Sequence, residues 1–271
     1  MTPPPPPSML APPRRGTVTL LVPARNEEAG IGRTLRTLPL ATLEAQGFAP
    51  HVLVLDGRSS DRTRDIARAR GAEVFVQSAP GKGNAVREGR HLVQSDYVVM
   101  LDADATYAPD AIPGVLEMLA RGEADVVMGS RFRGQRANGA MTRTNAVGNV
   151  ALSALASALF LRPCSDVCTG LWGFRGPVFQ SLPLQSTGFD LEVELFTRAV
   201  KEGWRVREVG VDYMPRAGGP DGTHLHPLRD GMAIGLRIVR TRLAPRPVRR
   251  EPGVGEHAWV DAGRRPWGGA P

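Results

Sequence analysis

The sequence predicts an α/β fold, in which one mostly parallel, Rossmann-like sheet carries helices on both of its faces. Short runs of β-branched or aliphatic residues alternate with helical patterns, which is typical of β-α-β units. The chain has 271 residues, 42% of them hydrophobic, which is enough to bury one sizeable core. Polar clusters directly follow several of the apolar runs, at the positions where open parallel sheets bind their ligands. We therefore expect a single α/β domain.

The first half of the chain is the more regular half. The first helical pattern is entered through Asn26, and a proline opens the pattern that begins at residue 109, as prolines often do in a first helical turn. Because each connection contains a helix, neighbouring strands are expected to be parallel. The predicted strands are 17–22, 51–55, 73–76, 97–101 and 125–128, and the predicted helices are 27–38, 61–70, 82–93 and 109–121.

The second half of the chain is less regular. Residues 143–160, 189–202 and 228–242 are predicted helices, and residues 205–213 form a predicted strand. The two ends differ in composition from the rest: the start is rich in proline, and the end is rich in Arg, Pro and Gly. We expect disorder at both ends. The expected boundaries are a Pro-rich arm at 1–16, a folded domain at 17–243 and a basic tail at 244–271.

Positive charge is concentrated at the ends of the chain. The net charge is +7, and residues 1–16 and 240–271 carry most of it, so a nucleic-acid-binding core is not expected. The start lacks the basic and apolar regions of a signal peptide, which favours a cytoplasmic protein. The only two cysteines, Cys164 and Cys168, have no nearby His and predict neither a zinc site nor a structural disulfide.

Two carboxylates, Asp102 and Asp104, follow the predicted strand 97–101. Strand ends of such a sheet lie at its ligand-binding edge, so both side chains are expected there. Oxygen ligands suit Mg²⁺ and Mn²⁺, and such an ion neutralises the charge on a departing diphosphate. The pair therefore predicts a Mg²⁺ or Mn²⁺ site, although an Asp-x-Asp pair alone is also common in solvated loops.

Polar residues follow other predicted strands as well. After the first strand, Glu27 can accept hydrogen bonds from a base or ribose, and Asp56 has the same potential after the second, although a plain turn also explains it. The segment Gly81-Lys82-Gly83 brings a cation to the start of a helix, without the spacing of a Walker loop. These clusters together predict a site for an anionic nucleotide.

Six motifs in this order resemble family 2 glycosyltransferases of the polyprenyl-phosphate (dolichyl-phosphate) mannosyltransferase type. The resemblance spans about residues 17–240. It implies a single GT-A domain, a nucleotide-diphospho-sugar donor, a divalent metal and inversion at the anomeric carbon. The motifs are Pro23-Ala24-Arg25-Asn26-Glu27, Asp56-Gly57-Arg58-Ser59, Gly81-Lys82-Gly83, Leu101-Asp102-Ala103-Asp104, Gly129-Ser130-Arg131-Phe132 and Thr169-Gly170-Leu171-Trp172-Gly173-Phe174-Arg175.

The resemblance also implies roles for single residues. Asp102, Ala103 and Asp104 match the positions that bind diphosphate and metal, and Arg131 and Arg216 match positions that bind phosphate. The positions that it assigns to the nucleotide are Pro23, Arg25 and Glu27, with Asp56 and Lys82 nearby.

Three positions depart from the family pattern. His224 stands in the phosphate-binding loop where the family has Lys, which would make activity fall as the pH rises through roughly 6.5. Gly57 replaces a second acid, and Thr106 replaces a Gln. The base and the sugar therefore stay open, with GDP-mannose and UDP-glucose as the first donors to consider.

Two acceptor classes fit these residues. A polyprenyl phosphate is already an anion, so metal binding at Asp104 and a cation at Arg131 would suffice for transfer. A hydroxyl acceptor, in a glycan or a secondary metabolite, needs a general base, for which Asp190, Glu192 and Glu194 are the candidates. A surface ion pair with a nearby arginine also explains at least one of these acids.

Other interpretations stay open beside transfer to a lipid. A nucleotidyltransferase would need a phosphate-binding loop after the first strand, and residues 23–28 do not provide one. A non-catalytic nucleotide-sugar-binding protein stays possible, because His224 replaces the family's Lys. Residues 146–161 are too few to span a membrane. Residues 145–160 and the basic tail fit peripheral contact with the inner leaflet of the cytoplasmic membrane, but core burial and a solubilising tail explain them too.

Overall fold

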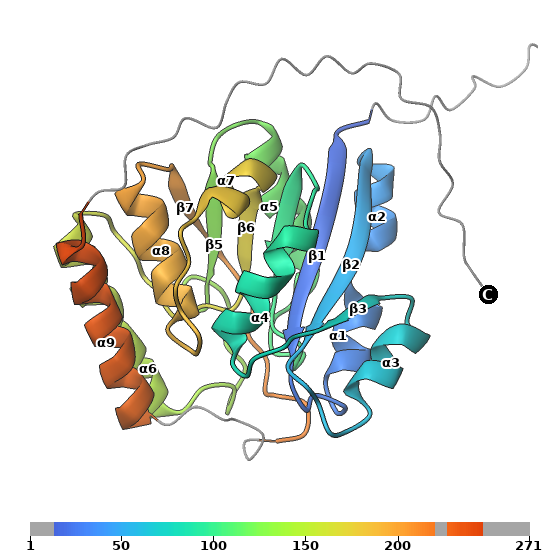
Figure 1. Cartoon of the computed structure of the whole chain (residues 1–271), viewed down its shortest axis with the longest axis horizontal. Coiled ribbons are helices and arrows are strands. Elements are labelled where there is room, and N and C mark those ends of the chain that lie inside the picture. Colours follow the sequence, from blue (N-terminus) through green and yellow to red (C-terminus); the bar gives the residue numbers. More distant parts are fainter. Residues whose placement is uncertain (1–13, 220–226, 246–271) are drawn as a thin grey trace, which may run out of the picture.

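The computed structural model describes residues 14–219 and 227–245, so most of the predicted arm and tail, and His224, lie outside the described residues. Its centre is a seven-stranded sheet with helices on both faces (Figure 1). The strand order is β3-β2-β1-β4-β6-β5-β7. The strands are β1 (Gly16–Ala24), β2 (Phe48–Asp56), β3 (Glu73–Val76), β4 (Tyr97–Met100), β5 (Val126–Ser130), β6 (Trp172–Arg175) and β7 (Val206–Gly210).

Helices cover both faces of this sheet, which confirms the predicted α/β fold. Successive residues of β1 point to opposite faces: Leu20 packs in the same core as α1, α2, α3 and α5, and Leu21 packs in the core that contains α4, α7 and α8. Burial on both sides explains why the strands read as nearly continuous apolar runs. The helices are α1 (Ile31–Thr37), α2 (Leu40–Ala45), α3 (Thr63–Ala69), α4 (Lys82–Gly89), α5 (Ile112–Ala120), α6 (Arg143–Phe160), α7 (Gly176–Ser181), α8 (Leu191–Lys201) and α9 (Pro227–Leu243).

Strand β6 is the one described strand that runs against the others, antiparallel to both β4 and β5. It was not predicted, because it has only four residues and contains Gly173, which weakens a strand pattern. A Cβ at Gly173 would overlap the side chain of Val115 in α5, so the glycine lets this helix lie close to the sheet. The sheet is therefore mixed, with six of its seven described strands in one direction.

The segment after β1 differs from the prediction. Helix α1 begins at Ile31, four residues after the predicted start at Glu27. Asn26 does not cap it: Asn26 has a positive φ of 52°, and its Oδ1 accepts a hydrogen bond of 2.8 Å from the backbone N of Ser60. The residue therefore ties the loop after β1 to the loop after β2, which holds Glu27 at the ligand-binding edge.

Helix α6 spans its predicted range, but it buries only some of its apolar residues. Its buried residues are Asn149, Ser153 and Ala156, whereas Val147 and Val150 are exposed. Core burial therefore accounts for only part of its apolar pattern: Ala156 lies in the core, and Leu152 and Leu159 pack partly buried against it. In the described part of the chain, no helix has the length and apolar character needed to cross a membrane.

Candidate functional site

The carboxyl ends of parallel strands bring the predicted site residues to one edge of the sheet. Glu27 follows β1, the two aspartates follow β4, and Arg131 follows β5 directly. They surround a cavity of about 310 Å³, which we call the donor cleft. Its lining includes Pro23, Arg25, Glu27, Lys82, Asp102, Ala103, Asp104, Arg131, Glu192 and Arg216.

Lys82 holds two carboxylates at one side of the donor cleft. Its Nζ donates to Oδ1 of Asp102 and to Oε1 of Glu192, each at 2.5 Å. Burial alone would lower the pKa of Lys82, but the two carboxylates raise it well above its ordinary value. Burial and the nearby charge of Asp102 raise the pKa of Glu192, although Lys82 opposes this. Lys82 is therefore a permanent cation beside the first aspartate.

Arg216 lies between two carboxylates at the other side. Its Nη2 donates to Glu27, and its Nη1 lies 3.2 Å from Oδ2 of Asp104. Burial and the charges of Asp104 and Asp102 raise the pKa of Glu27 to about 7, against the opposing effect of Arg216. Burial and Asp102 also raise the pKa of Asp104, whose Oδ1 accepts a hydrogen bond of 2.6 Å from Oγ1 of Thr106. The cleft therefore concentrates negative charge that only partly finds a cation.

Asp102 and Asp104 fit a divalent cation. Gly170 makes room for the first of them, because a Cβ there would overlap its carboxylate. The described residues contain no cluster of three or more His, Cys, Asp or Glu arranged to hold a metal ion. Two carboxylates still suit Mg²⁺ or Mn²⁺, since such ions keep several waters and take further ligands from substrate phosphates.

The two glycines around Lys82 serve packing. A Cβ at Gly81 would overlap the carbonyl oxygen of Thr187, and one at Gly83 would overlap that of Ser186. Gly81 also has a φ of +107°, which other residues rarely adopt. The absence of a side chain at both glycines therefore lets the segment before α8 pack closely against them. This packing places Glu192 within hydrogen-bonding distance of Lys82.

Asp56 lies deeper than the other predicted residues. Its side chain is fully buried, and its Oδ2 accepts a hydrogen bond of 3.1 Å from the backbone N of Ser59. Its Oδ1 is buried without a hydrogen-bond partner among the described residues. The neighbouring Leu55 and Gly57 line the donor cleft, so a free acceptor lies just behind its wall.

The structure does not bring Asp190 to the donor cleft. Its Oδ1 accepts a hydrogen bond from Ser186, and its Oδ2 accepts one of 2.7 Å from Nε of Arg237. Burial alone would raise the pKa of Asp190, but these two donors lower it. Glu194 is buried, and its carboxylate lies 3.5 Å from Nε of Arg198. The expected ion pair is therefore present in the interior, not at the surface.

A second, larger cavity of about 870 Å³ opens between the strand edge and the helices α6 and α9, and we call it the acceptor cleft. Three charged residues, Asp104, Arg131 and Arg216, line both cavities. The uncharged residues that line both are Asn145, Cys168, Tyr213 and Ile234. Most of its other lining residues are uncharged, among them Val147, Gly148 and Leu152. The acceptor cleft thus combines charged residues with apolar ones.

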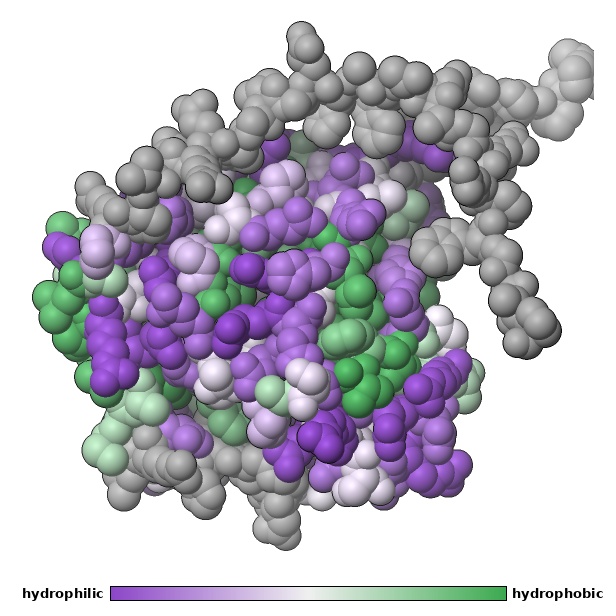
Figure 2. All heavy atoms as spheres, in the orientation of Figure 1, coloured by the Kyte–Doolittle hydropathy of each residue, from purple (hydrophilic) through white to green (hydrophobic). Residues whose placement is uncertain are grey.

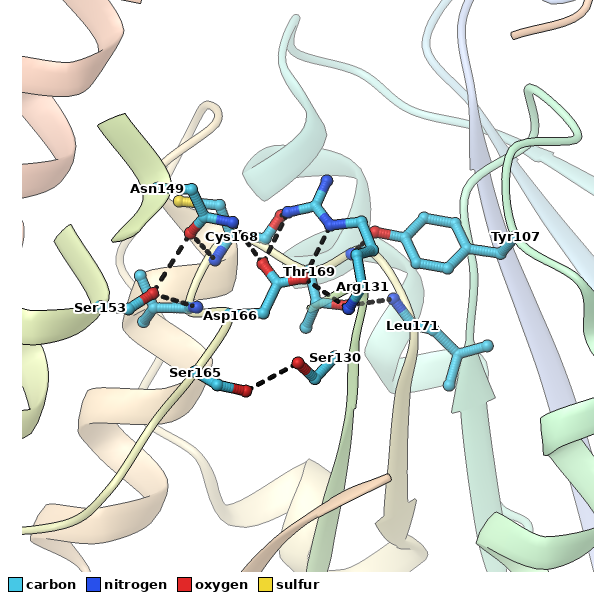
Figure 3. Close-up of polar contacts among 12 residues, drawn as sticks. Tyr107, Ser130, Arg131, Asn149, Ser153, Ser165, Asp166, Cys168, Thr169 and Leu171 are labelled. Carbon is cyan, nitrogen blue, oxygen red and sulfur yellow. Dashed lines mark hydrogen bonds and ion pairs between the residues drawn. The ribbon is translucent and has the colours of Figure 1, made fainter. Parts of the chain in front are cut away.

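Asp166 was not singled out from the sequence. It is fully buried, and its two carboxylate oxygens accept hydrogen bonds of 2.7 Å from Nε and Nη2 of Arg131 (Figure 3). It precedes the motif that begins at Thr169 by three residues. An acid in an otherwise uncharged segment was the available signal, but its partner lies 35 residues earlier in the chain.

Known proteins share this architecture. The family description Glycosyl transferase family 2 matches residues 19–182. The chain is 38% identical over 224 residues to glycosyltransferase AglJ of Haloferax volcanii, which covers 82% of this chain and 71% of that protein. It is 36% identical over 222 residues to the dolichyl-phosphate hexose transferase of the same organism. This match covers 82% of this chain and 92% of that protein.

Solved structures agree with these relatives. Glucosyl-3-phosphoglycerate synthase from Mycobacterium tuberculosis, in complex with phosphoglyceric acid, superimposes with a TM-score of 0.63 at 25% identity, covering 84% of this chain and 79% of that one. A second structure of that enzyme, in complex with Mn²⁺, UDP and glucosyl-3-phosphoglycerate, superimposes with a TM-score of 0.63 at 24% identity. It covers 83% of this chain and 78% of that one, and at this identity it shows only that the fold is similar. The GT-A fold expected from the six motifs is confirmed, and the chain belongs to glycosyl transferase family 2.

Proposed function

We propose that this chain is an inverting, metal-dependent hexosyltransferase that moves a hexose from a nucleotide-diphospho-sugar to a polyprenyl phosphate. One observation carries the proposal: the donor cleft and the acceptor cleft meet at Asp104, Arg131 and Arg216. Two phosphorylated substrates that react with each other need adjoining sites with cations at the junction.

The donor cleft suits a nucleoside diphosphate sugar. Asp102 and Asp104 would hold Mg²⁺ or Mn²⁺, which when bound neutralises the charge that grows on the diphosphate as it leaves. Lys82 and Arg216 already contact these two carboxylates, so they are placed to contact the phosphates as well. A base would contact the wall formed by Leu55 and Gly57, behind which the buried oxygen of Asp56 lies without a partner among the described residues.

The acceptor cleft suits a lipid phosphate better than a sugar. Its charged residues Arg131 and Arg216 can hold a phosphate, and Val147 and Leu152 offer apolar surface to a hydrocarbon chain. The dolichyl-phosphate hexose transferase of Haloferax volcanii, by its name, uses such an acceptor.

The chemistry follows from this placement. An oxygen of the acceptor phosphate attacks the anomeric carbon from the side opposite the diphosphate, the bond from that carbon to the diphosphate breaks, and the configuration inverts. A phosphate monoester, with a second pKa of about 6, is already an anion near neutral pH and needs no base. Arg131 and Arg216 bring the two anions together against their repulsion.

The alternative of a hydroxyl acceptor finds less support. A general base needs a pKa near the working pH and a lone pair that faces the acceptor. The pKa of Asp190 is lowered and its carboxylate is held by Ser186 and Arg237, whereas Glu192 is held by Lys82. Because cations already hold both carboxylates, a phosphate acceptor that needs no base is favoured.

We also propose that α6 and α9 contact the membrane surface. The helices pack against each other, and each exposes an apolar stripe beside the acceptor cleft. Figure 2 shows hydrophobic side chains at the left edge of the view, where Figure 1 places α9. A lipid acceptor could then enter the cleft without leaving the bilayer. The exposed residues are Val147, Val150 and Leu155 on α6, Leu161 directly after it, and Met232, Leu236, Val239 and Leu243 on α9.

A transfer assay tests the function directly. Purified protein is incubated with labelled GDP-mannose or UDP-glucose, Mn²⁺, and either a short polyprenyl phosphate or the matching polyprenol without phosphate. We expect a labelled lipid only with the phosphate, and its loss in Asp104→Ala or on addition of a chelator. Asp110→Ala, which removes an exposed acid outside both clefts, should leave the rate unchanged.

The negative outcomes have distinct meanings. Transfer to the polyprenol would replace the phosphate acceptor by a hydroxyl acceptor. Nucleotide-sugar binding with neither transfer nor hydrolysis would reduce the protein to a nucleotide-sugar-binding role.

A further inference from the structure

The guanidinium of Arg131 is held on three sides. Nε and Nη2 donate to Asp166, and Nη2 also donates to the carbonyl of Cys168 at 2.8 Å. The guanidinium carbon lies 5.2 Å from the ring centroid of Tyr213, an arrangement that favours a cation over an aromatic face. Nη1 has no hydrogen-bond partner among the described residues. Since Arg131 lines both clefts, one edge of its guanidinium is left for a ligand.

Asp166 is itself held by helix α6. Asn149 donates from Nδ2 to Oδ1 of Asp166 at 2.5 Å, and Oγ of Ser153 lies 3.3 Å from Oδ1 of Asn149. Ser153 also accepts a hydrogen bond of 2.9 Å from the backbone N of Val167, next to the aspartate. Figure 3 shows Asp166 between Asn149 and Arg131. These contacts explain why α6 buries the polar residues Asn149 and Ser153.

We infer that Asp166 is a positioning residue, which with Asn149 of α6 fixes the guanidinium of Arg131 at the junction of the two clefts. The inference rests on the proposed role of Arg131 in binding phosphate. A carboxylate that takes Nε and Nη2 sets the plane of the guanidinium and leaves only Nη1 to turn toward a ligand. Asn149 in turn fixes the plane of the Asp166 carboxylate. Helix α6, which lines the acceptor cleft, is thereby connected to the phosphate-binding Arg131 through hydrogen bonds.

Strand β5, which Arg131 follows, has an ion pair of similar geometry at its other end, away from both clefts. Asp125 precedes β5, as Arg131 follows it, and Asp125 accepts hydrogen bonds from the backbone N, Nε and Nη2 of Arg205. Asp166 accepts from the same three atoms of Arg131. The pair of Asp125 lies at the opposite end of the strand from both clefts. Asp125→Asn therefore removes an equivalent set of bonds without touching the site.

A double-mutant cycle tests the inference. The rate of nucleoside diphosphate release from the sugar nucleotide is measured for wild type, Asp166→Asn, Arg131→Gln and the double variant, with thermal unfolding for each. Positioning predicts that Asp166→Asn lowers kcat/KM by about 100-fold in the wild-type background, as expected for misplacement by about 1 Å. In the Arg131→Gln background it should change kcat/KM by less than about 3-fold, because the group that it positions is gone.

The control and a milder variant sharpen the outcome. Asp125→Asn should lower the melting temperature and leave kcat/KM within about 2-fold in both backgrounds. Asn149→Ala removes one bond from the carboxylate and keeps its charge, so it should show the same coupling to Arg131 with a smaller loss. This variant also serves if Asp166→Asn does not fold.

Equal losses of kcat/KM from Asp166→Asn in both backgrounds would overturn the inference and leave Asp166 a purely structural residue. Failure of the proposed function is a separate result. If polyprenyl phosphate accepts no sugar, the cycle is still measured on the diphosphate released with whichever acceptor works, water included.

Discussion

Each of the two aspartates at the end of β4 is paired with a cation. Lys82 contacts Asp102, and Arg216 contacts Asp104. The half-buried carboxylate of Asp102 repels the buried one of Asp104, and the raised pKa of Asp104 reflects its burial and that repulsion. A bound metal ion would take over this neutralisation and free both cations for the phosphates of the donor. The metal ion would therefore replace the contacts that Lys82 and Arg216 make with the two aspartates.

Gly170→Ala should weaken metal binding. A Cβ at this position would overlap the carboxylate of Asp102, which must then rotate away from its present place beside Lys82. We expect the affinity for Mn²⁺, measured by titrating activity or by calorimetry with the nucleotide present, to fall by about 10- to 100-fold. Gly114→Ala is the matched control, because a Cβ there meets nothing within 4 Å. Equal Mn²⁺ affinities in the two variants would contradict the assigned role of Asp102.

Glu27 should make the stability of the metal-free protein depend on pH. Its pKa is raised from 4.5 to about 7 in the fold, because burial and the charges of Asp104 and Asp102 disfavour its ionised form. A raised pKa means that its contribution is complete below about pH 4.5 and is lost as the pH rises through about 7. The loss amounts to at most about 3 kcal/mol.

The measurement is urea unfolding of the metal-free protein at pH 5 and pH 8. Glu27→Gln should lose less free energy of unfolding over this range than wild type. Glu28→Gln, at the exposed neighbouring position, should behave as wild type. An identical pH dependence for Glu27→Gln and wild type would show that Glu27 is not the responsible group.

Among the elements, those with a clear period were predicted well. The bounds of β3 and α6 agree with the prediction, and both faces of the sheet are covered as expected. The missed elements are β6, α2 and α7, none longer than six residues. Such short segments carry too few residues for a period to stand out. Strand β6 also depends on Gly173, a residue that argues against a strand in any local pattern.

The site was predictable where a residue follows a strand, and not where two distant segments meet. The donor-cleft residues could be grouped in advance, because parallel strands end at one edge. The bonds of Asp166 to Arg131 and Asn149 join three separate segments, and no local pattern encodes such a contact. Likewise, the apolar pattern of α6 favoured core burial, whereas its polar residues Asn149 and Ser153 face inward.

The exposed stripe of α6 permits a direct test of membrane contact. Val150→Glu places a charge on a side chain that is 51% exposed, so the free energy of unfolding should change by less than about 0.5 kcal/mol. We expect cosedimentation with vesicles that contain anionic lipid to fall sharply, because a charge would have to enter the apolar boundary.

Val76→Glu is the matched control for this variant. Val76 is 39% exposed and ends β3, the strand at the opposite edge of the sheet from β7. Its vesicle binding should equal that of wild type. Binding retained in Val150→Glu and in a second variant, Leu236→Glu on α9, would contradict membrane contact through these helices.

The molecule as a whole places its two clefts on one rigid sheet edge. The donor cleft is formed by loops after β1, β4 and β5 together with the starts of α4 and α8, so a ligand there contacts segments from most of the fold. Any ligand that binds only the native state stabilises the entire domain by mass action. The donor site can therefore be examined through global stability, without knowledge of the acceptor.

Thermal unfolding should reveal both whether nucleotide binding depends on metal and which nucleotide base the donor cleft prefers. With ligand at 100 times its Kd, stabilisation is about 2.7 kcal/mol, which corresponds to a rise in Tm of roughly 5–10 °C for a domain of this size. We expect this rise with nucleoside diphosphate plus Mn²⁺. Either ligand alone should give much less. Without the ion, the diphosphate meets carboxylates whose charge Lys82 and Arg216 only partly offset, and without the diphosphate, the ion lacks phosphate ligands.

Comparison of GDP with UDP in this experiment should identify the preferred base, since only the base differs between the two ligands. Asp104→Ala should remove the part of the rise that requires Mn²⁺, whereas Asp110→Ala should keep it. A full rise with a chelator present would contradict the metal site. The carboxylate pair would then act through Lys82 and Arg216 alone, and these two cations would have to neutralise the leaving diphosphate by themselves.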